Sequence, residues 1–192
     1  SVLTETIIKE ANRKVGLIGT LGIRYANERI ESINTTPESL EIQRTLRRMC
    51  NFDIGSVVME VSSHGLKLER VEGCDFRVAA ISNLSQDHLD FHQDMKSYAE
   101  AKQILFKRYL QKNGTAVINI SDPSTLDFVE IVARRGIRII KVSKVEMPEA
   151  DIFCENFVCG SDSTTMKVST PGGSFETQIP LIGTFNVENS LY

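Results

Sequence analysis

The sequence predicts an α/β domain with a mainly parallel sheet flanked by helices. Apolar runs of strand length recur through the first three quarters of the 192 residues, and amphipathic helical segments separate most of them. These runs are residues 14–22, 54–61, 77–83, 114–122 and 137–143. Alternation of strand and helix is typical of a parallel sheet with right-handed crossovers. The length is enough for one well-buried domain, or for one domain with a small lobe.

A first helix is expected over residues 2–13, and a polar loop is expected before Asn34. The segment NTTPESLEIQRTLRRMC then predicts a second helix, because Thr36 is a good N-cap and Pro37 suits the first helical position. The free backbone N–H groups of this helix start, together with the hydroxyls of Thr35 and Thr36, suit an anion or a polar ligand. Plain helix capping is the alternative interpretation.

Polar residues follow the second apolar run. Glu60 lies near the end of that run, where a carboxylate needs a polar partner or a metal ion. Ser62, Ser63 and His64 come next and are expected to cap or line the mouth of the strand. A serine nucleophile with its histidine base is disfavoured, since neighbours on a loop rarely point together and no G-x-S-x-G turn is present. Arg70 is either an ordinary exposed arginine or a ligand for phosphate or carboxylate.

The segment 83–102, NLSQDHLDFHQDMKSYAEAK, is the richest in chemistry-bearing side chains. It follows the strand-like run RVAAISN, which is expected to be buried. Its ionisable members include His88, His92, Asp87, Asp90, Asp94 and Lys102. Open α/β sheets bind ligands just beyond the carboxyl ends of their strands. Aspartate and histidine also ligate hard or borderline divalent cations, so this segment is the main candidate site.

Geometry limits how this segment serves one site. On a continuous helix His88 and Lys102 would lie about 21 Å apart, so the chain must bend between them. Residues 92–94 are the expected bend, with Asp94 capping a helix that carries an apolar stripe. That stripe consists of Met95, Tyr98, Leu105 and Phe106. Lys102 lies on the stripe, either as a half-buried lysine that extends its amine to water or as a lysine held near metal or phosphate.

The last third combines one more strand–helix–strand unit with a change of pattern. Asn119 and Asp122 are expected at the carboxyl end of a strand, and Ser124 is expected to cap the helix that Gly136 ends. Shorter segments separated by glycine and serine turns occupy residues 151–180 and predict a small antiparallel sheet. In the final segment, LIGTFNVENSLY, Asn186 and Asn189 are expected to flank a helix start.

Composition excludes several classes of protein. The formal net charge is −3, which disfavours a nucleic-acid or membrane surface. No apolar run has membrane-spanning length. The four cysteines form no C-x-x-C pair and predict free thiols in a reducing cytoplasm. The sequence does not determine the oligomeric state, and a monomer is the expectation.

Four blocks resemble the Mur ligase family. They are NTTP (34–37), MEVSSHGL with a following arginine (59–70), NLSQDHLDFHQDM with a tyrosine and AK (83–102), and GTFNVENSL (183–191). The blocks stand in the family's order and spacing, and together they span nearly the whole chain. The resemblance implies the family's central, ATP-binding domain, spanning residues 1–192, from a member that adds the third amino acid of the bacterial cell-wall peptide.

The resemblance also implies a mechanism and its metal ligands. ATP phosphorylates the carboxylate of UDP-N-acetylmuramoyl-dipeptide, and the amine of a diamino acid attacks the resulting acyl phosphate. Two Mg²⁺ ions are implied, one bound by Glu60 and one by His88 with a carbamylated Lys102. Partial burial favours the neutral amine that captures CO₂, and the resulting anionic oxygens suit magnesium. Lys102 and His88 are therefore the implied catalytic residues.

The substrate and nucleotide contacts are implied in the same way. Asn34, Thr35, Thr36, Ser62 and Arg70 are implied to contact the UDP-linked substrate. Asn83, Asn186 and Asn189 are implied to bind ATP, the last two near the adenine. The implied enzyme is cytoplasmic and bacterial.

Three departures from the family pattern qualify this picture. The phosphate loop, Gly-x-x-Gly-Lys-Thr, is expected just before Ser1, and the domain for the incoming amino acid is expected after Tyr192. We therefore expect the chain on its own to be inactive. Leu68 stands where many members have glutamine, and Gln93 where glycine is common. The alternatives are a sibling ligase, such as folylpolyglutamate synthetase or another cell-wall ligase, and a non-catalytic binding domain with the same fold.

Overall fold

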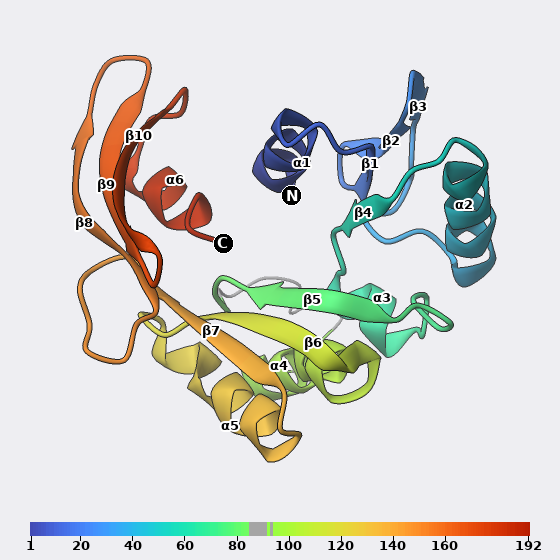
Figure 1. Cartoon of the computed structure of the whole chain (residues 1–192). Coiled ribbons are helices and arrows are strands. Elements are labelled where there is room, and N and C mark those ends of the chain that lie inside the picture. The colour runs from blue at the N-terminus through green and yellow to red at the C-terminus, as the bar shows by residue number, and fades with distance from the viewer. Residues whose placement is uncertain (85–91, 93) are drawn as a thin grey trace. The chain divides into compact units, whose positions relative to one another are not determined.

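The computed structural model describes residues 1–84, 92 and 94–192. The chain divides into two compact units, each formed from two stretches of sequence (Figure 1). The first unit comprises Ser1–Cys74 and His88–Ile104, and the second comprises Asp75–Asp87 and Leu105–Tyr192. Each unit has its own sheet, with strand order β3-β2-β1-β4 in the first and β10-β9-β8-β7-β6-β5 in the second. The predicted α/β class is confirmed.

The first unit combines its four-stranded sheet with helices. Its elements are α1 (Val2–Glu10), β1 (Val15–Gly19), β2 (Gly22–Tyr25), β3 (Glu28–Ile30), α2 (Ser39–Asn51), β4 (Ser56–Met59), α3 (Ser63–Lys67) and α4 (Met95–Ile104). β1 pairs in parallel with β4, and its five residues are all buried. This is the environment that a continuous apolar run predicts.

The prediction of a polar loop before Asn34 is wrong, because residues 22–30 form the antiparallel strands β2 and β3. Gly22 makes the tight turn from β1 possible. Its φ is +90°, and a Cβ atom there would lie 2.6 Å from the carbonyl oxygen of Ile30. Ile23 and Tyr25 are buried while Arg24 is partly exposed, as the period of two along a strand requires. The alternation is only four residues long, so it gives a weak signal in the sequence.

The second predicted helix also begins later than expected. α2 starts at Ser39 with Glu38 at the N-cap position, and Glu38 makes no capping hydrogen bond with its side chain. Thr36 is therefore not a cap, and its hydroxyl bonds elsewhere, as described below. The helix buries Ile42, Thr45 and Met49, whose spacing of three and four residues places them on one face.

The second unit contains the six-stranded sheet. Its elements are β5 (Phe76–Ile81), the π-helical turn Leu105–Tyr109, β6 (Leu110–Asn119), the 3₁₀ turn Pro123–Thr125, α5 (Leu126–Arg134), β7 (Arg138–Ser143), β8 (Ile152–Cys159), β9 (Thr164–Thr170), β10 (Gly173–Ile179) and α6 (Thr184–Asn189). β5 to β8 are parallel, and β8 to β10 are antiparallel.

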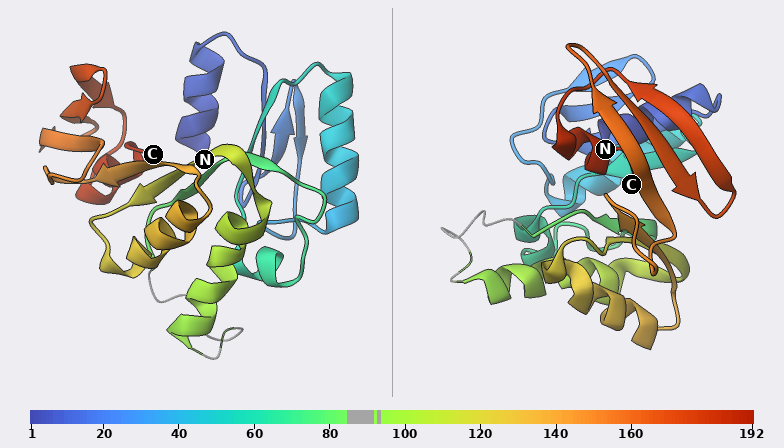
Figure 2. Two further views of the ribbon diagram at one scale, coloured as in Figure 1. Left: turned by 60° about the horizontal axis from the view of Figure 1, so that its bottom comes forward. Right: turned by 90° about the vertical axis from the view of Figure 1, so that its left-hand side faces the viewer.

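The antiparallel meander predicted for residues 151–180 is present. It continues the parallel sheet through the pairing of Val142 with Ile152, so it is not a separate sheet (Figure 2). A buried cluster forms around α6, and its members are Val142, Cys154, Met166, Val168, Val187 and Leu191. This cluster joins the meander to the parallel strands.

Two local expectations in the second unit are corrected. β5 is not a fully buried strand, because Val78 is 57% exposed and β5 lies at the edge of its sheet. Ser124 does not cap α5. Asp122 instead accepts a hydrogen bond from the Ser124 backbone N–H and begins the short 3₁₀ turn, and α5 follows it.

The remaining global expectations concern thiols and membranes. Cys50, Cys74, Cys154 and Cys159 form no disulfide. Among the described residues, no helix is long and apolar enough to cross a membrane.

The packing of α5 generates a stability prediction. Phe128 is fully buried, and its ring packs edge-on against Phe106 with centroids 5.2 Å apart. Phe128→Ala should lower the free energy of unfolding by about 3–5 kcal/mol, because it removes a large buried ring and leaves a cavity. Urea unfolding followed by circular dichroism measures this change.

Phe175→Ala is the matched control, since Phe175 is 52% exposed on β10. Its effect should stay within about 1 kcal/mol. Similar losses for both variants would contradict the assignment of Phe128 to the core.

Candidate functional site

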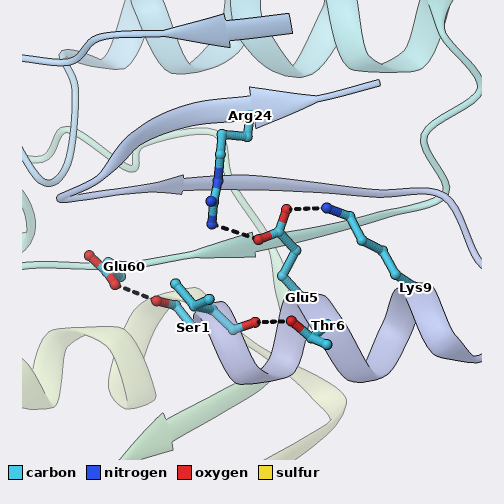
Figure 3. A network of polar contacts seen from close by, with 7 residues as sticks. Ser1, Glu5, Thr6, Lys9, Arg24 and Glu60 are labelled. Carbon is cyan, nitrogen blue, oxygen red and sulfur yellow. Dashed lines mark hydrogen bonds and ion pairs between the residues drawn. The ribbon is translucent and has the colours of Figure 1, made fainter. Parts of the chain in front are cut away.

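The Glu60 carboxylate is the centre of a polar cluster in the first unit. It lies just after β4, and its backbone N–H donates to the carbonyl oxygen of Ile18 at 2.8 Å. Its Oε2 accepts hydrogen bonds from the backbone N–H and the hydroxyl of Thr20, at 2.7 and 2.8 Å. Its Oε1 accepts one from the Ser1 hydroxyl (Figure 3). Both carboxylate oxygens are thus held in place.

These contacts determine the protonation state of Glu60. Burial raises the pKa of the carboxyl group, but the hydrogen bonds from Ser1 and Thr20 outweigh burial. The net result is a pKa below the ordinary value of 4.5. Glu60 is therefore an anion at neutral pH.

Thr36 links the Glu60 strand end to the next helix. It is fully buried, and its Oγ1 lies 3.0 Å from the Glu60 carbonyl oxygen and 3.1 Å from the Ser62 hydroxyl. The same oxygen accepts a hydrogen bond from the Ser62 backbone N–H at 2.9 Å. Ser62 in turn caps α3, since its hydroxyl accepts from the Gly65 N–H at 3.0 Å. Ser62 therefore caps a short helix that was not predicted from the sequence, and Ser63 and His64 lie within that helix.

Arg70 lies beside the same threonine. One nitrogen of its guanidinium donates to the Thr36 carbonyl oxygen at 3.1 Å, and the other forms an ion pair with Glu38 at 2.8 Å. Its side chain is only 15% exposed, so it is not an ordinary surface arginine. Its Nε is buried and has no hydrogen-bond partner among the described residues.

The Thr35 hydroxyl lies 3.1 Å from that of Thr20 and thereby joins the Glu60 cluster. Asn34 comes immediately before it and is half-buried. Contacts therefore join five of the sequence-predicted residues into one region, namely Thr35, Thr36, Glu60, Ser62 and Arg70. Asn34 adjoins this region only through its place in the chain. Thr20 was not predicted, because nothing in the sequence marks a threonine after β1 as a partner for Glu60.

A chain of side chains runs from α3 to Lys102 on α4. His92 is 4% exposed, and its Nε2 lies 2.9 Å from the hydroxyl of the buried Ser63. Its ring also packs against those of His64 and Tyr98, with centroids 5.6 and 5.3 Å away. The Lys102 amine lies 5.1 Å from the centre of the Tyr98 ring, which is cation–π distance.

The start of α4 agrees with the prediction that Asp94 caps this helix. Asp94 Oδ1 accepts a hydrogen bond from the Ser97 N–H at 2.7 Å, so Asp94 caps the helix. Hydrogen bonds from the Ser97 backbone and hydroxyl lower the pKa of this carboxyl group. Lys102 is half-buried, as its position on the apolar stripe predicts. His88, the other predicted catalytic and metal-binding residue, lies outside the described residues, as do Asp87 and Asp90.

The second unit has its own polar cluster beyond β6. The buried Asn119 side chain donates to the Ser82 carbonyl oxygen at 2.7 Å and to Glu188 at 2.5 Å. Burial tends to raise the pKa of Asp122, but hydrogen bonds from Ser124 and Leu84 lower it overall. The structure thus joins the ends of β5 and β6 to α6, and the role of Glu188 was not predicted.

The three asparagines expected at ATP all belong to this second unit. Asn83 is exposed just after β5. Asn186 donates to the Ile182 carbonyl oxygen at 2.8 Å, and Asn189 is the exposed last residue of α6. Asn186 and Asn189 therefore lie within α6 and do not flank its start, because the helix already begins at Thr184.

The oxygen atoms at and around the Glu60 carboxylate are suitable ligands for a hard divalent cation. They are the carboxylate and the hydroxyls of Ser1, Thr20 and Thr35, and magnesium prefers such oxygen ligands. Over the described part of the chain, no group of three or more His, Cys, Asp and Glu side chains is placed to share a metal ion. Any cation at this position would depend on the hydroxyls as well as on Glu60.

Comparison with known proteins identifies the family. The model of the Mur ligase middle domain matches residues 2–192. The chain belongs to the Mur ligase family. It is 39% identical, over 203 aligned residues, to the UDP-N-acetylmuramoyl-L-alanyl-D-glutamate–2,6-diaminopimelate ligase of Bacillus licheniformis. The alignment covers 100% of this chain and 39% of that Mur ligase, so the chain spans about two fifths of its relative's length.

Solved structures agree with this assignment. A structure of a UDP-N-acetylmuramoyl-L-alanyl-D-glutamate–2,6-diaminopimelate ligase superposes with a TM-score of 0.88 at 30% identity, over 98% of this chain and 38% of that one. A MurF ligase from Thermotoga maritima in complex with ADP has a TM-score of 0.69 at 17% identity, over 98% and 40% of the two chains. The second likeness supports the Mur ligase fold alone.

The lowered pKa of Glu60 predicts a pH-dependent contribution to stability. The carboxylate stabilises the folded state fully above its ordinary pKa of 4.5, and this contribution is lost as the pH falls through the lower folded value. Near pH 7, Glu60→Gln should therefore cost about 1–2 kcal/mol, allowing for the partial exposure of the group. The difference from wild type should shrink as the pH falls through the folded pKa of Glu60.

Chemical denaturation at several pH values measures this difference. Glu41→Gln, at an exposed position on α2, is the control. If the destabilisation by Glu60→Gln stays constant down to acid pH, Glu60 does not stabilise the fold as an anion.

Proposed function

We propose that this chain is the central, ATP-binding domain of an amide ligase that adds diaminopimelate to UDP-N-acetylmuramoyl-dipeptide in the bacterial cytoplasm. The observation that carries the proposal is 39% identity, along the whole chain, to a ligase named for that amino acid. Because the chain spans only part of that relative, the activity is assigned to the intact protein that carries it.

The proposed reaction joins a carboxylate to an amine. ATP transfers its γ-phosphoryl group to the carboxylate of the dipeptide and leaves as ADP. The amine of diaminopimelate then attacks the acyl phosphate, and the amide forms with release of phosphate and a proton. When bound, Mg²⁺ supplies positive charge that spreads the charge of the phosphate groups. The protein's part is to align the reacting groups, since little covalent chemistry is required of its side chains.

Glu60 is the residue that we assign to the first magnesium position. It is anionic, and three hydrogen bonds from Ser1 and Thr20 hold its two oxygens in place. A carboxylate held in this way loses little conformational freedom when it binds a cation. The nearby hydroxyls are oxygen ligands of the type that magnesium accepts.

Lys102 and His88 are assigned to a second magnesium position, with Lys102 carbamylated. The half-buried position of Lys102 on α4, with its amine 5.1 Å from the centre of the Tyr98 ring, supports this assignment. Carbamylation would replace the cation that now faces Tyr98 with an anion, so the cation–π attraction would be lost. A divalent cation compensates that loss by binding the new oxygens.

We assign the UDP-linked substrate to the part of the Glu60 cluster that contains Thr35, Thr36 and Arg70. Arg70 is largely buried, and its guanidinium fork suits a phosphate or carboxylate. Thr35 and Ser62 supply hydroxyls on this side of the cluster, and the buried Thr36 holds Ser62 in place. Asn34 precedes these threonines in the chain. Asn83, Asn186 and Asn189 are assigned to the nucleotide.

The assignment of Lys102 generates a kinetic prediction for the intact protein. Lys102→Ala should reduce the ligase rate by at least about 100-fold, because the ligand of one metal ion would be lost. Short carboxylates such as acetate or formate should restore part of this activity by supplying the missing oxygens. Release of phosphate that depends on both the dipeptide substrate and diaminopimelate measures the rate.

Lys96→Ala is the matched control, since Lys96 is exposed on the same helix. It should retain ordinary activity. A fully active Lys102→Ala variant would rule out the carbamate role, and a wild-type protein without ligase activity would rule out the proposed function itself.

A second prediction separates substrate binding from nucleotide binding. Arg70→Ala should weaken binding of the UDP-linked dipeptide by roughly tenfold or more, because a charge-assisted contact is lost. Binding of ADP should stay nearly unchanged. Isothermal titration with each ligand tests both statements, and thermal melting checks that the protein remains folded. Equal loss of both affinities would argue against the assignment of Arg70.

A further inference from the structure

The helix α1 is anchored by a charge. Its only buried residue in the described structure is Glu5, which is 3% exposed. Among its larger apolar side chains, Val2 is 40% and Ile7 is 64% exposed, and Leu3 and Ile8 are only partly buried. A helix on the surface of a sheet is ordinarily held by an apolar stripe. A single buried carboxylate is an unusual anchor.

The carboxylate of Glu5 is held by two cations (Figure 3). Its Oε2 accepts from the Arg24 guanidinium on β2 at 2.7 Å, and its Oε1 accepts from the Lys9 amine at 2.7 Å. Lys9 is one turn further along α1, and its side chain is 57% exposed, so its contribution is small. The Arg24 side chain is only 28% exposed. Arg24 is therefore the contact that ties α1 to the sheet.

The anchor lies one helical turn from the Glu60 cluster. The backbone N–H of Glu5 donates to the Ser1 carbonyl oxygen at 2.9 Å, and the Ser1 hydroxyl donates to Glu60. Glu60 is itself attached to β1 through the Ile18 carbonyl oxygen. The first turn of α1 therefore meets the four-stranded sheet at two polar points, Glu5 with Arg24 and Ser1 with Glu60.

Stabilisation of the fold does not by itself explain the Glu5–Arg24 ion pair. Replacement of a buried ion pair by well-packed apolar side chains is often neutral or stabilising. The Arg24 Nε is also buried with no hydrogen-bond partner among the described residues, which carries a cost. An ion pair does fix orientation. It restricts both the rotation of a helix about its axis and the position of the helix along that axis. Apolar contacts restrict these less.

We propose that the Glu5–Arg24 ion pair is a positioning device that holds the first turn of α1 so that Ser1 meets Glu60. The inference rests on the proposed function and deepens it, because it concerns the position assigned to the first magnesium ion. Glu5 and Arg24 act through Ser1 and do not touch the ligand. The pair should therefore affect magnesium-dependent nucleotide binding and leave the UDP-linked dipeptide almost unaffected.

The test is a double-mutant cycle on the intact protein. Titration calorimetry measures the dissociation constant of ADP in the presence of Mg²⁺, without any catalytic turnover. Glu5→Gln should weaken this binding by roughly tenfold, and the effect should fall to about twofold or less in a Ser1→Ala background. An equal effect in both backgrounds would overturn the proposal, because the pair would then act only through general stability.

A charge swap and two controls complete the test. The double variant Glu5→Arg with Arg24→Glu should recover most of the lost ADP affinity if the pair itself is required. Lys9→Ala and Glu130→Gln should have little effect, the latter at the exposed Glu130–Arg134 pair on α5. If Glu5→Gln does not fold, Arg24→Lys in both Ser1 backgrounds replaces it, with the same expected loss of coupling.

The test of the Glu5–Arg24 pair and the test of the proposed ligase activity can fail independently. A wild-type protein that binds Mg²⁺ and ADP but forms no amide would refute the ligase assignment and leave the cycle interpretable. A wild-type protein that binds no nucleotide would overturn the positioning role as well.

Discussion

The half-buried Glu60 carboxylate imposes requirements on several distant parts of the first unit. A buried anion needs donors, and the structure supplies them from the residue after β1 and from the start of α1. It also needs room. A Cβ atom at Gly19 would lie 2.6 Å from Glu60 Oε2, so the end of β1 must be glycine for the carboxylate to approach. Strand β1, the residue that follows it and the start of α1 all contribute a contact to Glu60.

From Glu60 the polar contacts extend in two directions. On one side, Thr36 connects the strand end to Ser62, and Arg70 holds the carbonyl oxygen of the same threonine. On the other side, Ser63, His92 and Tyr98 lead to Lys102. These contacts are buried or half-buried, where hydrogen bonds are stronger than in water, so the network holds its members in fixed positions.

The second unit follows the same design principle with different residues. Asn119 at the end of β6 is fully buried and is satisfied by Ser82 and Glu188, which come from either end of the unit's sequence. Burial and the neighbouring Glu188 raise the pKa of Tyr192, so that its phenol stays protonated beside α6. In both units polar side chains gather at the ends of parallel strands, where α/β sheets place their ligands.

The sequence by itself determined the alternation of strands and helices, the antiparallel meander and most of the residues around Glu60. These follow from local information, namely periodicity, capping and the kinds of side chain in the NTTP and EVSSH segments. Tertiary structure alone decided which groups meet. Thr20 and Ser1 are partners of Glu60 from 40 and 59 positions away, and no local pattern encodes such pairings. Thr36 could cap a helix by its sequence, but the fold buries it against Glu60 and Ser62, where hydrogen bonds between distant segments outweigh the local preference.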